Sequence, residues 1–93
     1  NGLQFDLNTI DNLETLDFSV FPNPNQGVFN IKHNLDQEVT IEIFSLTGKM
    51  KFFKSTHQKN FIIDLSNEKS GVYIIQLKSP KEIIGCKKLI INN

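Results

Sequence analysis

Few side chains in this sequence could carry out acid–base, nucleophilic or metal chemistry. The chain contains two histidines and one cysteine. His33 ends an alternating segment, and His57 lies in a polar stretch between Thr56 and Gln58. No third ligand stands at a spacing typical of a zinc site, and nothing in the sequence brings a serine, a histidine and an aspartate together as a triad. We therefore expect neither histidine to be catalytic or to bind a metal.

The single cysteine, Cys86, excludes an internal disulfide and a thiolate metal cluster. It follows Gly85 in an apolar segment, where a lone cysteine usually packs as a small core side chain. Adjacent Lys87 and Lys88 could lower a thiol pKa, so a reactive cysteine is the alternative. The five glycines are too far apart for a phosphate-binding loop, and the aspartates are too scattered for a calcium loop. The sequence thus predicts no enzyme, no cofactor and no small-molecule substrate.

Length and composition predict one small folded domain. The chain has 93 residues, 39% of them hydrophobic, and a formal net charge of zero. It therefore has no overall attraction to nucleic acid, and no apolar run is long enough to cross a bilayer. Every basic residue is lysine, so the planar arginine fork that suits bidentate phosphate or base contacts is absent. The chain begins with neither an initiator Met nor a signal peptide, and we expect a piece of a larger polypeptide.

Charge divides the chain into two parts. Residues 1–17 hold four acids and no lysine, whereas residues 18–93 hold ten lysines and six acids, so the two parts carry −4 and +4. We interpret 1–17 as an acidic lead-in from a preceding cargo domain and 18–93 as the folded body. Alternation at 3–7 also allows an added strand, and the spacing of Ile10, Leu13 and Leu16 allows one or two helical turns.

Apolar and polar residues alternate along most of the body, as in half-buried β-strands. In the segment 28–33, for example, Phe29 and Ile31 share one face. We expect strands at 18–21, 28–33, 39–44, 49–54, 60–65, 72–77 and 82–91. Short strands at this spacing, with no helical segment between them, are typical of an antiparallel sandwich or barrel. We predict an all-β fold, a seven-stranded antiparallel immunoglobulin-like β-sandwich, with a small barrel as the alternative.

Turn residues separate these strands. Pro22 and Pro24 fix φ, and Gly27 supplies a backbone conformation that other residues resist. Gly48 predicts a tight hairpin between two strands, and Gly71 closes a longer polar bend.

The final strand combines a basic start with an apolar finish. Lys87 and Lys88 precede Leu89, Ile90 and Ile91. Lysines on an edge strand commonly protect it from pairing with other chains. The alternative is a strand that a partner grips by backbone pairing, which would also allow strand pairing between copies.

Four segments of the body follow one another in a distinctive order. A hydrophobic strand leads into Pro-Asn-Pro, a glycine and an aromatic–aliphatic pair within Phe18–Ile31, and an aliphatic strand ends in a glycine turn within Ile41–Lys49. A Gly-aliphatic-Tyr strand follows within Gly71–Ile75, and Lys-Lys with aliphatic residues fills Lys87–Ile91. The residues of this pattern outside the last segment are Phe21, Pro22, Asn23, Pro24, Gly27, Phe29, Ile31, Gly48, Gly71, Val72 and Tyr73. The pattern resembles the C-terminal sorting domain of the type IX secretion system, over residues 18–93.

The resemblance implies a role as a secretion signal. The parent would be a larger secreted protein of a Bacteroidetes-type bacterium, in the periplasm during transit and at the cell surface or outside the cell afterwards. It implies two kinds of partner, the outer-membrane type IX translocon and a sortase-type cysteine protease at the cell surface that removes the domain. We expect the protease to cut in the lead-in before Phe18.

We expect the translocon to recognise Lys87, Lys88, Leu89, Ile90 and Ile91, while the loop 22–27 and the strand from Gly71 to Tyr73 maintain the fold. The alternative function is an immunoglobulin- or fibronectin-like module that binds carbohydrate or protein. Phe44, Phe52 and Phe53 are then the candidates for stacking on sugars.

Overall fold

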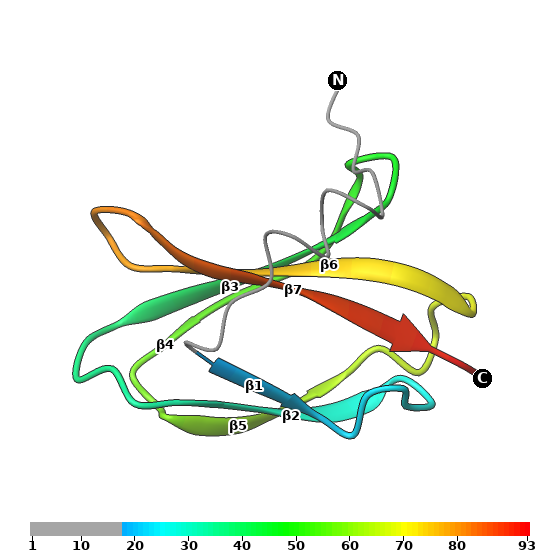
Figure 1. Ribbon diagram of the computed structural model, residues 1–93, viewed down its shortest axis with the longest axis horizontal. Helices are drawn as coiled ribbons and strands as arrows, with labels where there is room; N and C mark the ends of the chain where they lie inside the picture. The colour runs from blue at the N-terminus through cyan, green and yellow to red at the C-terminus, as the bar shows by residue number, and fades with distance from the viewer. Residues whose placement is uncertain (1–17) are drawn as a thin grey trace.

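The computed structural model describes residues 18–93, which form two antiparallel β-sheets. The strands are β1 (Phe18–Phe21), β2 (Val28–His33), β3 (Val39–Ser45), β4 (Met50–Thr56), β5 (Asn60–Asp64), β6 (Gly71–Lys78) and β7 (Ile83–Ile91). One sheet has the order β1-β2-β5 and the other the order β4-β3-β6-β7. The two sheets form separate layers in Figure 1. The predicted seven-stranded immunoglobulin-like β-sandwich is confirmed.

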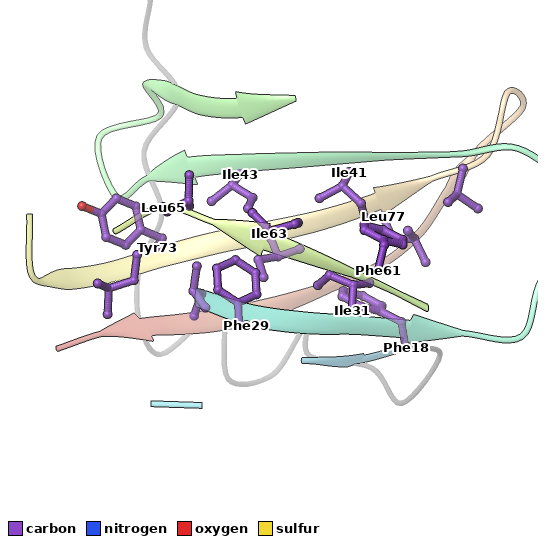
Figure 2. Close-up of a cluster of buried hydrophobic side chains, with 14 residues drawn as sticks. Phe18, Phe29, Ile31, Ile41, Ile43, Phe61, Ile63, Leu65, Tyr73 and Leu77 are labelled. Carbon is purple, nitrogen blue, oxygen red and sulfur yellow. The ribbon is translucent and has the colours of Figure 1, made fainter. Parts of the chain in front are cut away.

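The core lies between the sheets and consists of side chains that alternate inward along each strand (Figure 2). In β2, Phe29 and Ile31 are buried, whereas Asn30 is half-buried and Lys32 is exposed. The core positions expected from alternation are therefore occupied as predicted in this strand. Fully burying an isoleucine or phenylalanine side chain contributes about 1.5–3 kcal/mol. The buried core residues are Phe18, Phe29, Ile31, Val39, Ile41, Ile43, Phe61, Ile63, Leu65, Tyr73, Ile75, Leu77, Leu89 and Ile91.

Strand β4 departs from the alternation expected over 49–54, where the sequence predicts Met50 and Phe52 on one face. A register shift between Ile43 and Phe44 of the neighbouring β3 interrupts the ladder. Phe52 pairs with Ile43 and packs against the core, whereas Met50 pairs with Phe44 and is 46% exposed. The predicted shared face is wrong, because an extra residue at a β-bulge turns the side chains beyond it to the other face.

Glycines shape two of the connections. Gly27 has a φ of 102° and Gly48 a φ of 90°, in the left-handed region that favours glycine. The Gly48 N–H donates to the Ser45 carbonyl at 3.0 Å and closes the β3–β4 hairpin, as predicted. Between β1 and β2, the peptide bonds before Pro22 and Pro24 are both cis.

The described part of the chain contains no helix of the length and apolarity needed to cross a bilayer. The lead-in at 1–17, with its alternative strand and helical turns, lies outside the described residues.

Candidate functional site

His33 is part of the packing at the end of β2. The side chain is buried, the Leu35 N–H donates to its Nδ1 at 3.1 Å, and its Nε2 lies 2.8 Å from the Gln58 carbonyl oxygen. Because Nδ1 accepts a hydrogen bond, Nε2 carries the proton and donates to Gln58. The ring meets Phe61 edge to face, with the centroids 6.4 Å apart. His33 thus ties β2 to the connection between β4 and β5.

The other reactive side chains lie apart from His33. His57 is exposed in the bend after β4. Cys86 is half-buried opposite Gln76, whereas the neighbouring Gly85 is buried. The expected core position of Cys86 is wrong, because the register of β7 turns Gly85 inward and Cys86 to the outer face. No group of three or more His, Cys, Asp or Glu side chains within residues 18–93 could hold a metal ion.

The segment expected to be recognised by the translocon divides between two faces of β7. Leu89 is 0% exposed and Ile91 is 1% exposed, and both belong to the core between the sheets. Lys88 and Ile90 alternate with them, are half-buried, and face away from the core. A folded domain therefore presents the side chains of Lys88 and Ile90, whereas Leu89 and Ile91 act through packing.

Lysines cover both open sides of the sandwich. Lys87 of β7 places its Nζ 5.9 Å from the ring centroid of Phe18, which begins β1. On the opposite side, the Nζ of Lys54 lies 5.6 Å from the ring centroid of Phe61. The lysine stems extend over apolar surface and place the ammonium groups near aromatic faces. Lys87 therefore lies at the seam between β7 and β1, on the same face of β7 as Leu89 and Ile91.

The outer edge of β7 is hydrogen-bonded to the loop between β1 and β2. The Asn25 N–H donates to the Ile90 carbonyl at 3.0 Å, and the Asn92 N–H donates to the Asn25 carbonyl at 2.7 Å. The Asn23 side chain spans the same edge, since its Nδ2 donates to the Lys88 carbonyl at 2.8 Å and its Oδ1 accepts from the Ile90 N–H at 2.9 Å. We call these four hydrogen bonds the Asn clasp. The loop and the end of β7 lie at the same end of the sandwich in Figure 1.

Asn25 and Gly27 fix the loop from inside. Asn25 is 6% exposed, its Nδ2 donates to the Pro22 carbonyl at 2.9 Å, and its Oδ1 accepts from the Gly27 N–H at 2.8 Å. The Leu65 N–H donates to the Gly27 carbonyl at 2.6 Å. A Cβ at Gly27 would lie 2.6 Å from the Cα of Ser66. The loop is thus held against the end of β5 on one side and against β7 on the other, and it joins the two sheets.

Contacts at the chain end hold the last residue against the turn before β6. The Asn93 N–H donates to the Ser70 Oγ at 2.9 Å, and its Nδ2 donates to the Glu68 carbonyl at 2.7 Å. In the same turn, the Tyr73 hydroxyl donates to the Lys69 carbonyl at 2.6 Å. Burial, and then the negative charge of Glu68, raise the pKa of Tyr73, which keeps the hydroxyl protonated as a donor.

Several residues of the pattern that resembles the sorting-domain family contribute to the core or to strand pairing. Phe29, Ile31 and Tyr73 are buried in the core. Val72 is half-buried in β6 and pairs with Ile90 of β7. The role of Asn25 was missed by the sequence prediction, because no local pattern indicates that a polar loop residue is buried against a strand 65 residues further along.

The three aromatic candidates for sugar binding do not form an exposed platform. Phe44 is 8% exposed, Phe52 packs against the core, and Phe53 is 55% exposed. Stacking on a sugar ring requires an accessible aromatic face. Of the three candidates, Phe53 alone offers one.

The geometry therefore describes a β-sandwich module whose last strand is held along its outer edge by an asparagine-rich loop. The chain belongs to the family of secretion system C-terminal sorting domains, whose sequence model matches residues 19–92. It is also 28% identical over 85 residues to ulvan lyase NLR42 from Nonlabens ulvanivorans. That match covers 90% of this chain and 16% of the lyase, so the chain spans a small part of that protein's length.

Membership of this family gives the domain its role. It is a type IX secretion signal for a larger cargo protein, and the cargo is exported to the cell surface or the extracellular space. The expectations drawn from the resemblance for family, export and destination are confirmed.

Proposed function

We propose that components of the type IX translocon recognise this domain through the outward side chains of β7, with Lys87 beside them at the seam. The observation that carries this proposal is the division of β7 into two faces, with Lys88 and Ile90 outward and Leu89 and Ile91 in the core. The end of β7 is hydrogen-bonded to β6 on one edge and to the Asn clasp on the other. These bonds hold its outward side chains in one geometry, which lowers the entropy cost of binding. The positive charges of Lys88 on the outward face and of Lys87 at the seam each favour a carboxylate on the partner.

Deleting residues 87–93 would not test this proposal, because the deletion also removes Leu89 and Ile91 from the core. We therefore suggest a double variant, Lys87→Gln with Lys88→Gln, in a neutral reporter fused to residues 1–93. Both changes remove the charge and leave an unbranched polar side chain that is shorter than that of lysine. We expect the reporter to decrease several-fold in the medium and to accumulate in the periplasm.

The matched control is Lys32→Gln, which removes an exposed lysine from the outer face of the other sheet. We expect this control to be exported like the parent. Circular dichroism melting of each purified fusion checks that the domain is still folded. Normal export of the folded double variant would show that these charges play no part in recognition.

We also propose that a sortase-type cysteine protease at the cell surface cuts the exported protein upstream of Phe18. Support comes from Phe18 itself, which is 2% exposed and pairs with His33 in the β1–β2 ladder. Cleavage within β1 would require the sandwich to open, whereas cleavage before it would not. Mass spectrometry of the secreted cargo should find a new C-terminus before residue 18. A mature cargo that retains the loop 22–27 would contradict the proposal.

A further inference from the structure

We propose that the translocon binds this domain with the Asn clasp closed, so that the exposed residues of the loop 22–27 and the outward face of β7 form one composite recognition surface. The proposal rests on the proposed function, since it specifies which surface the translocon contacts. It concerns two segments that lie 65 residues apart in the chain between Asn23 and Lys88.

The first argument concerns the backbone of β7. Recognition by strand addition requires a free row of N–H and C=O groups along a strand edge. Along the end of β7, the carbonyls of Lys88 and Ile90 and the N–H groups of Ile90 and Asn92 already bond to the loop. The opposite edge pairs with β6, and Asn93 bonds to Ser70. A partner strand would have to break the clasp before it could pair here, so recognition through side chains costs less.

The second argument concerns the loop. Pro22, Asn23, Pro24 and Gln26 are exposed, whereas Asn25 is buried and bonds within the loop. The exposed residues are therefore presented on a fixed backbone, and proline φ angles add to that rigidity. Because Asn23 bonds to the backbone of Lys88 and Ile90, these loop residues lie along the outer edge of β7, which borders its outward face.

The composite surface defines the chemistry of its partner. Pro22 and Pro24 are exposed and offer apolar contact, and Lys88 lies on the outward face of β7 where Asn23 bonds to its carbonyl. The partner that fits is a folded protein surface of the translocon, with an apolar rim facing the prolines and a carboxylate facing Lys88. A partner that supplied an extended strand would instead need the clasp open.

A disulfide can hold the clasp closed. Gln26 and Asn92 are both exposed and follow directly after Asn25 and Ile91, which form a parallel bridge. Neighbouring strands lie about 4.7–4.9 Å apart, within the Cα separation of about 4.4–6.8 Å that a disulfide accepts. We therefore suggest Gln26→Cys with Asn92→Cys, in a Cys86→Ser background that removes the natural thiol. The oxidising periplasm supports formation of the bond.

The experiment measures export of a neutral reporter fused to residues 1–93. We expect the oxidised double-cysteine variant to reach the medium as efficiently as the Cys86→Ser parent. Asn23→Ala removes two hydrogen bonds of the clasp. The loss of each bond shifts the equilibrium between the closed and the open clasp about fivefold toward the open form. We expect several-fold lower export of Asn23→Ala and restored export when the disulfide is added. Asn23→Ala with Gln26→Cys alone is the matched control, and it should remain defective.

Three results would overturn the proposal. A folded, oxidised variant trapped in the periplasm would show that the translocon needs the clasp open. Normal export of Asn23→Ala would show that the clasp plays no part in recognition. Failure of the folded pair to oxidise would contradict the closed clasp itself. Failure of the proposed function is distinguishable, because the folded Lys87→Gln, Lys88→Gln variant would then be exported normally, whatever the Asn23→Ala and disulfide variants show.

Discussion

Single residues determine whether the loop between β1 and β2 can close on β7. Asn25 satisfies the buried Gly27 N–H with its own side chain, and Gly27 lets the loop approach Ser66 without a Cβ. A buried N–H that loses its acceptor costs about 1–3 kcal/mol. The structure therefore requires these two residue types to close the loop, and neither is needed to contact a ligand.

Gly27→Ala tests the close approach at this loop. The added Cβ would lie 2.6 Å from the Cα of Ser66 and 2.9 Å from the carbonyl carbon of Leu65, at a φ of 102°. We expect a loss of about 3 kcal/mol or more in the free energy of unfolding, measured by urea titration. Gly71→Ala is the matched control, because its φ is also positive but its Cβ would meet nothing within 4 Å. The control should lose only about 1 kcal/mol from backbone strain. Equal losses would contradict a steric role for Gly27.

Asp64 gives the same region a dependence on pH. Hydrogen bonding from the Ser66 side chain, and then from its backbone N–H, lowers the pKa of Asp64. Since the unfolded pKa is about 3.9, the unfolded chain binds the proton first as the pH falls. The stabilisation is present above that pH and is lost as the pH falls through the lower folded value. We expect Asp64→Asn to flatten the decline in stability below about pH 5, measured by urea titration at several pH values.

A second carboxylate provides the comparison for this measurement. A hydrogen bond and charge from Lys59 lower the pKa of Asp36, so Asp36→Asn should also flatten the acid limb. The Asp36 effect arises from an exposed ion pair and should weaken in about 1 M salt, whereas the Asp64 effect should persist. Salt that abolished both effects equally would contradict the hydrogen-bond origin assigned to Asp64.

At the level of elements, one face of β7 packs in the core and the other lies at the surface. Leu89→Ala removes a fully buried side chain and should cost about 2–5 kcal/mol of stability. Ile90→Ala alters a half-buried outward side chain and should cost about 1 kcal/mol. Thermal and urea unfolding measure both. A larger loss for Ile90→Ala than for Leu89→Ala would contradict the assigned faces of the strand.

The elements also show what the sequence can predict. All seven strands were predicted close to their observed positions, because alternation with a period of two reports directly which face is buried. Met50 and Cys86 were placed wrongly, since a bulge or a strand register is set by the neighbouring strand and leaves little trace in the local pattern. The Asn clasp was not predicted for the same reason, because its partners come from opposite ends of the body.

At the scale of the whole molecule, the clasp joins the first and last strands of the sandwich. The loop after β1 bonds to β7, and Gly27 bonds to Leu65 beside β5, so the sheets are linked at one end. A sorting signal that works behind unrelated cargo benefits from a self-contained core and a fixed surface. We therefore regard the folded body, rather than a short linear segment, as the signal.

Secretion of a neutral reporter fused to residues 1–93 tests that claim most directly. The measurement compares the reporter in the medium for hosts with and without the type IX translocon, alongside a fusion that carries the destabilising substitution Gly27→Ala, whose folding is checked by circular dichroism. The account predicts export of the unmodified fusion only in the host with the translocon, and retention of the Gly27→Ala fusion in the periplasm. Equal export from both hosts, or full export of a Gly27→Ala fusion whose sorting domain is found unfolded, would contradict this prediction.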